Sequence, residues 1–213
     1  MNTTHLFEVA AQIAVLLFAV SFHESAHGLV ALKCGDRTAL EAGRISLNPL
    51  RHLDPIGSLF VPLFLAAMNL PIFGWARPVP VSLVGVPNPR RANLLISAAG
   101  PLSNVLLALA SALGFFVLRP FLGGNARESA VGWLLIAAAG SVIVNVSLAV
   151  FNLFPIPPLD GFGVLQSLLP ARLFPLVIWL RRFGFIILLV VMYTGLLNPV
   201  FRLALDPVYR WLR

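Results

Sequence analysis

Long apolar runs separated by short polar segments dominate the pattern of the chain. The clearest runs predict membrane-spanning helices, because each approaches the roughly 20 residues that cross a hydrocarbon core. A backbone in lipid must also satisfy its own hydrogen bonds, which favours helices. The predicted spans cover residues 6–32, 92–118, 131–154 and 183–201. The pattern therefore predicts an all-α polytopic membrane protein with about four to five transmembrane helices.

One further apolar run, Pro55 to Phe73, is interrupted by Pro62, Asn69 and Pro71. A proline inside a helix removes a hydrogen bond and kinks the chain, so this run either crosses the membrane or enters it and returns. If it crosses, the basic residues of the loops divide nine to six between the two sides. If it returns, ten of the fifteen basic residues share one side, in segments 33–54, 74–91 and 155–182. The positive-inside rule favours a re-entrant segment.

Two short segments have the character of membrane-associated β-strands. Ile45 and Leu47 alternate with polar neighbours, as in a half-buried strand. The segment 74–81 contains two prolines, which exclude a helix and leave an edge-type strand.

Toward the end of the chain, an interfacial helix is expected over 173–180, ending at Arg181–Arg182 before the last span. The tail 202–213 mixes aromatic and basic residues, which suits the lipid headgroup layer. All 213 residues are predicted to form a single membrane-embedded domain, with a core over about 6–169 and a C-terminal part over 173–213.

Composition supports the membrane assignment and excludes other classes. The chain is 59% hydrophobic and 11% charged, whereas soluble domains are about 25% charged. The net charge of +7 comes from basic residues placed between apolar runs. They indicate topology and not a nucleic-acid interface, which would need a clustered basic patch. The single cysteine, Cys34, excludes an intramolecular disulfide. The lipid bilayer is thus an expected partner and nucleic acid is not, while the oligomeric state stays open.

Three ionisable residues interrupt the first apolar run with the spacing His23-Glu24-x-x-His27. Helical residues four apart differ by roughly 40° in direction and about 6 Å along the axis, so both histidines face one side. Two imidazoles beside a carboxylate base are typical of zinc hydrolases. Polar residues at membrane depth are costly and usually functional. The alternative interpretation is a buried polar network that joins helices.

A hydrolytic zinc site needs a third protein ligand. Asp160 is a candidate, because it follows a break containing Pro155 and Pro157 and precedes the flexible Gly161. It could equally cap a helix over 161–169, and spacing alone leaves both roles open. His52 is expected to form a cap or an interfacial hydrogen bond.

The chain resembles the site-2 protease family of intramembrane zinc metalloproteases. His23 to His27 matches the first family motif, and Asn152 to Gly161 is similar to its Asn-x-x-Pro-x-Pro-x-Leu-Asp-Gly signature. Gly100-Pro101-x-x-Asn104 resembles the middle motif. The segment 74–81 resembles an extended element beside the active site in a compact bacterial branch. We find no PDZ or CBS domain, and segment 55–73 is extra relative to a minimal core, so regulation and substrate choice are not specified.

The resemblance implies one Zn²⁺ per chain, held by His23, His27 and Asp160, with Glu24 as the catalytic base. It further implies that Asn104 and Asn152 line the substrate path or steady the reacting carbonyl. Other residues of the matching motifs are candidates for substrate binding: Gly100, Pro101, Pro155 and Pro157. The implied activity is endopeptidase cleavage of transmembrane segments of membrane proteins. The expected location is a bacterial or archaeal cell membrane, with the active site nearer the cytoplasmic side.

A membrane transporter that moves metal ions or protons through the His, Glu and Asp cluster is the alternative function. Such a protein would be expected to contain inverted repeats, and the sequence shows no internal repeat. It would also not need the proline-rich segment before Asp160. A di-iron membrane hydroxylase is excluded because four histidines are too few.

Overall fold

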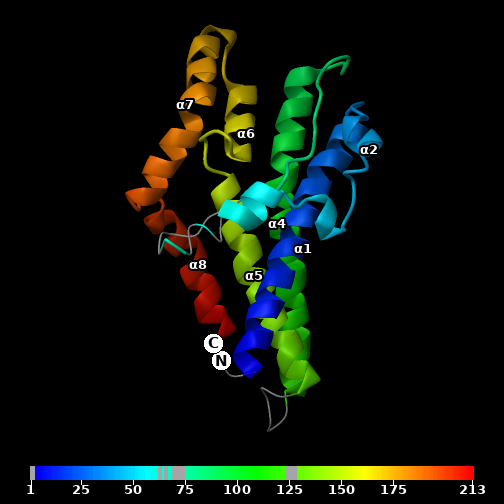
Figure 1. The fold of residues 1–213 in the computed structure, drawn as a ribbon, viewed down its shortest axis with the longest axis vertical. Coiled ribbons are helices and arrows are strands. Elements are labelled where there is room, and N and C mark those ends of the chain that lie inside the picture. Colours follow the sequence, from blue (N-terminus) through cyan, green and yellow to red (C-terminus); the bar gives the residue numbers. More distant parts are fainter. Residues whose placement is uncertain (1–2, 62–63, 65–66, 69–74, 123–128) are drawn as a thin grey trace.

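The chain folds into a set of helices of very unequal length (Figure 1). The computed structural model describes residues 3–61, 64, 67–68, 75–122 and 129–213. The α-helices are α1 (Thr3–Lys33), α2 (Thr38–Glu41), α4 (Pro89–Leu118), α5 (Ala130–Asn152), α6 (Asp160–Leu168), α7 (Phe174–Tyr193) and α8 (Asn198–Leu212). Short π or 3₁₀ turns lie at η1 (Pro49–Arg51), η2 (Pro55–Phe60), η3 (Arg119–Phe121) and η4 (Ala171–Leu173).

Four helices in the described residues are long and apolar enough to cross a membrane. They cover Ala10–Lys33, Pro89–Phe121, Ala130–Asn152 and Ala171–Tyr193. Many of their large apolar side chains point outward, as Leu106 and Phe116 do at 64% and 67% exposure. The prediction of an all-α, multi-pass membrane protein is confirmed at this level.

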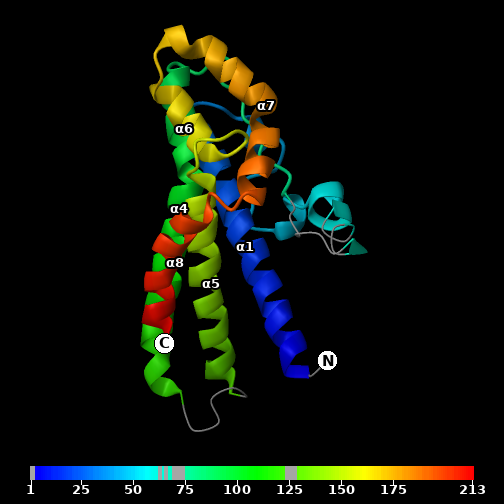
Figure 2. The ribbon, with the colours of Figure 1, turned by 90° about the vertical axis from the view of Figure 1, so that its left-hand side faces the viewer.

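Helices α1, α4 and α5 pack against one another as a three-helix bundle. Helix α6 packs against α4, and α8 packs against α5. Figure 2 shows α1 and α5 running side by side, with α6 and α7 at the end of the molecule remote from the N-terminus. This arrangement brings the middle of α1 close to the start of α6, although the two segments are far apart in the sequence.

The predicted break at Arg181–Arg182 is wrong, because α7 continues through both residues to Tyr193. The guanidinium of Arg181 donates to the side-chain oxygen of Gln166 in α6, at 2.8 and 3.0 Å, so its charge has a polar partner on the neighbouring helix. The break comes later, where Gly195 adopts a φ of 70°. Glycine tolerates this left-handed conformation, and the last span therefore ends at Tyr193 and not near Phe201.

The two predicted strands do not form in the described part of the chain. The segments around Ile45 and 75–81 are irregular, and their backbone groups bond to other partners. The N–H of Arg77 donates to the His52 carbonyl at 2.8 Å, and the N–H of Val79 donates to Glu24. A strand requires a ladder of bonds to a neighbouring strand, which these contacts replace.

The predicted re-entrant run 55–73 lies partly outside the described residues, since 62–63, 65–66 and 69–74 are not described. The start of the run is described through residue 61, and Trp75 follows two residues after its end. The N–H of Trp75 donates to the Gly57 carbonyl at 3.1 Å, and the hydroxyl of Ser58 donates to the Trp75 carbonyl at 2.8 Å. Trp75 therefore lies beside the start of the run.

Candidate metal centre

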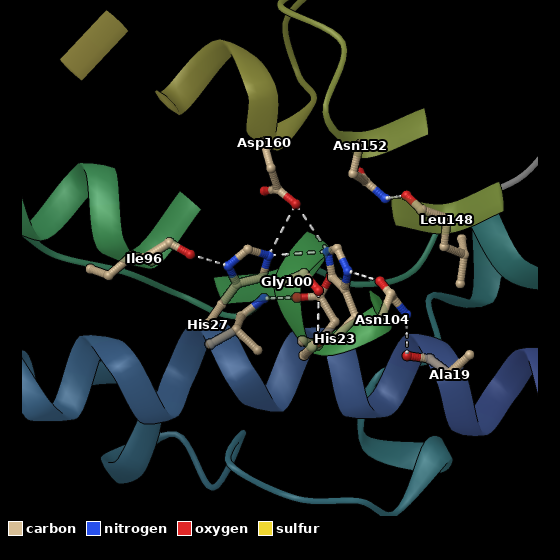
Figure 3. Close-up of polar contacts among 12 residues, drawn as sticks. Ala19, His23, His27, Ile96, Gly100, Asn104, Leu148, Asn152 and Asp160 are labelled. Carbon is tan, nitrogen blue, oxygen red and sulfur yellow. Dashed lines mark hydrogen bonds and ion pairs between the residues drawn. The ribbon is translucent and has the colours of Figure 1, made fainter. Parts of the chain in front are cut away.

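Three side chains from two distant segments converge near the middle of the bundle (Figure 3). His23 and His27 lie one turn apart on α1, and both are buried. Asp160 is the first residue of α6. Its Oδ2 lies 3.1 Å from Nε2 of His23 and 3.3 Å from Nε2 of His27, and the two Nε2 atoms are 3.1 Å apart. The three atoms thus form a nearly equilateral triangle.

Hydrogen bonds on the other side of each ring fix which nitrogen faces this triangle. Nδ1 of His27 lies 2.6 Å from the Ile96 carbonyl, which can only accept, so Nδ1 carries the proton. Nδ1 of His23 lies 2.6 Å from Oδ1 of Asn104 and donates to it. Both Nε2 atoms therefore present lone pairs. Histidines that bind metals commonly donate their other N–H in this way.

The donor set fits a zinc ion. When both rings are neutral, two imidazole lone pairs and a carboxylate oxygen face one another, an arrangement that a bound cation stabilises. Oδ2 of Asp160 is also buried without a hydrogen-bond partner. Tetrahedral ligands at Zn–N and Zn–O distances of about 2.0 Å are separated by roughly 3.3 Å, close to the observed triangle. Asp160 makes no side-chain capping bond, since α6 is preceded by Leu159 as its N-cap residue.

Gly100 of α4 lies directly against the two imidazoles. A Cβ atom added to Gly100 would lie 2.5 Å from Nε2 of His23 and even closer to Nε2 of His27. Real Cβ atoms do not approach other atoms so closely. The missing side chain therefore lets α4 pack on α1 at the level of the three donors.

Glu24, the next residue along α1, contacts the irregular segment before α4. Its Oε2 accepts a hydrogen bond of 2.8 Å from the N–H of Val79. Because proline has no backbone N–H, Pro78 and Pro80 offer no donor on either side. The carboxylate is therefore held by the one backbone donor of the sequence 78–80.

A second set of contacts attaches the loop 44–52 to the same region. The hydroxyl of Ser25 donates to the Ser46 carbonyl at 2.6 Å, and Nε2 of His52 donates to the same carbonyl at 2.7 Å. His52 is only 2% exposed and is not part of the group of three candidate metal donors. The hydrogen bond of His52 belongs to the loop that covers the motif.

The other predicted site residues divide into two groups. Asn104 and Gly100 lie at the two histidines. Asn152 faces away from them, since its amide donates to the Leu148 carbonyl of its own helix at 3.0 Å (Figure 3). Three prolines were also predicted to bind substrate. Pro101 is buried within α4, Pro155 is exposed, and Pro157 packs against Gly184 of α7.

Sequence reasoning missed Asn145 of α5, which is fully buried and bonded to Asn104. The available signal was an amide side chain within an apolar span, which is costly in lipid and therefore marks a role.

Comparison with curated proteins finds relatives over most of the chain. "Putative zinc metalloprotease YwhC" of Bacillus subtilis (strain 168) is 38% identical over 193 residues, which cover 86% of this chain and 80% of the relative. "Putative zinc metalloprotease Rip2" of Mycolicibacterium smegmatis is 33% identical over 190 residues, which cover 89% of this chain and 69% of the relative. No family model and no solved structure matches the chain.

Proposed function

The chain belongs to the site-2 protease family, and from this premise we propose that it is an intramembrane zinc endopeptidase that cleaves membrane-embedded segments of other proteins. The observation that carries the proposal is the triangle of His23, His27 and Asp160, with edges of 3.1 to 3.3 Å. These side chains would hold one Zn²⁺ per chain. The names of the relatives support a protease role.

Zinc, when bound, supplies a Lewis acid and lowers the pKa of water toward neutrality. The chain's own residues supply the rest of the chemistry. Glu24 takes the proton of the attacking water and passes it to the leaving amine, the role of a general base and then acid. Its hydrogen bond to the Val79 N–H orients the carboxylate and leaves Oε1 available for that proton.

Substrate would be bound in an extended form, because the carbonyls of a helix are already hydrogen-bonded. The irregular segment that contains Val79 lies beside Glu24 and carries few backbone donors. We propose that it pairs with the unwound substrate through its carbonyl groups, as in strand addition. Asn152 keeps one amide hydrogen beyond its bond to Leu148 and remains the proposed donor to substrate, with Pro155 and Pro157 shaping the same side.

The contacts of Asn104 support a different task from the one that the resemblance implies. It is 0% exposed, and its amide donates to Asn145 at 2.8 Å and to the Ala19 carbonyl at 3.5 Å. Both amide hydrogens are therefore occupied, and its oxygen accepts from His23. We propose that Asn104 positions His23 and does not donate to a reacting carbonyl.

We also propose an orientation with the active site nearer the cytoplasm. His27 precedes Lys33 by six residues, roughly 9 Å of helix, and Lys33 opens the basic loop 33–54. The positive-inside rule places that loop in the cytoplasm. The contacts of Trp75 with Gly57 and Ser58 support the proposal that the run 55–73 is re-entrant.

The test is cleavage of a tethered transmembrane reporter by the purified chain in proteoliposomes. Glu24→Gln is expected to retain zinc and lose at least 100-fold in rate, the size of a general-base contribution. Glu41→Gln is the matched control, because Glu41 is exposed on α2 and its ion pair in the described part of the chain is with Arg37. Full activity of Glu24→Gln, or activity that survives complete zinc removal, would exclude the mechanism. Zinc flux without cleavage in the same liposomes would indicate a transporter.

A further inference from the structure

A line of polar side chains runs from α5 through α4 to α1 within the apolar bundle (Figure 3 shows its α4–α1 end). Asn145 of α5 accepts from the Asn104 amide at 2.8 Å, and Asn104 of α4 accepts from Nδ1 of His23 at 2.6 Å. At the other end, the Asn145 amide donates to the Ser141 carbonyl at 2.9 Å. Buried polar groups are costly unless every hydrogen-bonding atom is satisfied, so a line of them inside an apolar bundle indicates a role.

The Ser141 carbonyl fixes the direction of every bond in this line. A backbone carbonyl only accepts, so the nitrogen of the Asn145 amide group faces it and the Asn145 oxygen faces Asn104. That oxygen in turn requires the nitrogen of Asn104, which leaves the Asn104 oxygen to face His23. A neutral His23 must then carry its single proton on Nδ1 and present Nε2 without a proton.

Bulk water does not reach these positions. Asn104 and Asn145 are both 0% exposed. Each amide can therefore satisfy its neighbours only in the orientation that the line dictates. If the Asn104 amide were flipped, its nitrogen would face Nδ1 of His23. Two donors would then face each other, unless the histidine proton moved to Nε2.

We propose that Asn145 is a positioning residue, which acts through Asn104 to keep Nε2 of His23 free of a proton and aimed at the metal. The proposal rests on the metal-binding part of the proposed function. It extends the site to a residue on α5, a helix that contributes none of the three donors.

Two substitutions of Asn145 separate this role from simple packing. Asn145→Leu keeps the size of the side chain and removes its acceptor. Asn145→Asp keeps both functions in its neutral form, since its O–H can donate to Ser141 while its carbonyl oxygen accepts from Asn104. Ser147→Ala is the control, because Ser147 lies on the same helix and, among the described residues, its hydroxyl bonds only to the Ile143 carbonyl of α5.

The experiment measures the zinc dissociation constant of each full-length variant in detergent. The same samples, free of metal and labelled with ¹⁵N-histidine, report the tautomer of His23 by NMR, with His23→Gln used to assign its signal. For Asn145→Leu we expect about tenfold weaker zinc binding, the low end for residues that support metal ligands. We also expect partial movement of the His23 proton to Nε2. Asn145→Asp and Ser147→Ala should match the unmodified chain in both measurements.

Several outcomes would overturn the proposal. One is a neutral His23 that carries its single proton on Nε2 in the metal-free unmodified chain, a result that needs no variant to fold. The others are unchanged zinc binding in Asn145→Leu and a loss in Asn145→Asp as large as the loss in Asn145→Leu. Neither measurement depends on peptide cleavage, so a chain that binds zinc without cleaving would reject the proposed function and leave the role of Asn145 standing.

Discussion

A Cβ atom on Gly100 would lie 2.5 Å from Nε2 of His23, so the histidine occupies the space that any larger residue would need. We therefore expect Gly100→Ala to displace the imidazoles and weaken zinc binding by at least tenfold, as a shift in ligand geometry does. Titration with a competing chelator measures this.

Gly114→Ala is the control for Gly100→Ala. Gly114 lies on the same helix, and nothing lies within 4 Å of where its Cβ would be. Alanine favours helix by up to about 1 kcal/mol over glycine, so this variant should bind zinc normally and be as stable or more so. Equal zinc affinity in the two variants would show that Gly100 is not needed for close packing at the site.

Asp160→Asn should lower zinc occupancy sharply, because an amide replaces the charged oxygen that lies 3.1 Å from His23. We expect about 100-fold weaker binding, the upper range for changes at a metal site. Metal analysis after dialysis measures this. Asp206→Asn, on the exposed face of α8, serves as the control. Full zinc content in Asp160→Asn would remove Asp160 from the set of ligands.

Val79→Pro should slow cleavage without releasing zinc. It deletes the N–H that holds Glu24, whereas Val79→Ala keeps that N–H and only shortens the side chain. We expect a fall in kcat of about tenfold or more for the proline variant, part of what a positioned base contributes. Comparing kcat, KM and zinc content of both variants checks this. Equal kcat values would show that the hydrogen bond does not orient Glu24.

Asp36 should make folding stability depend on pH. Burial acts to raise its pKa, but hydrogen bonds from Thr38 and from the Ser82 N–H outweigh burial and lower the pKa below its ordinary value of 3.8. A lowered pKa means that the ionised form stabilises the fold above about pH 4 and that this stabilisation is lost as the pH falls through the folded-state pKa.

Asp36→Asn should therefore cost about 1.5–3 kcal/mol at pH 7, the range for hydrogen bonds to a charged group, and much less near pH 2. Thermal unfolding of both metal-free chains at each pH measures the difference. A difference that does not change with pH would show that the charge of Asp36 is not involved.

Cys34 is the single cysteine and lies two residues before Asp36, in the turn after α1. In intact cells, a membrane-impermeant maleimide should leave it unlabelled, and labelling should appear when the cytoplasmic side is opened. The reverse result would invert the proposed orientation of the active site.

Three of the four long helices could be predicted from hydrophobic run length, and their observed ends lie within three residues of the predicted ones. The continuity of α7 through Arg181 could not be predicted from its own sequence, because the polar partner of Arg181 is Gln166 of another helix. A pair of charges in an apolar run indicates the membrane–water interface only when the fold gives those charges no polar partner on another helix.

The site was predictable where spacing on one helix determines it, as for His23 and His27. The approach of Asp160 depends on how α6 packs, and spacing alone did not distinguish a metal donor from a helix cap. The contacts of Asn145 and of the Val79 N–H depend on interhelical packing that no local pattern encodes. The expected strands failed because their backbone groups found partners on α1 and in the loop 44–52.

The three proposed zinc donors are separated by 133 residues of chain, from His27 to Asp160. During synthesis, the first span is therefore inserted long before the ribosome has made the carboxylate that completes the cluster. A nascent chain that stops short of α6 carries only two of the three proposed donors, His23 and His27, too few for a hydrolytic centre. Under the proposed function, unfinished molecules in the membrane would be harmless to their neighbours.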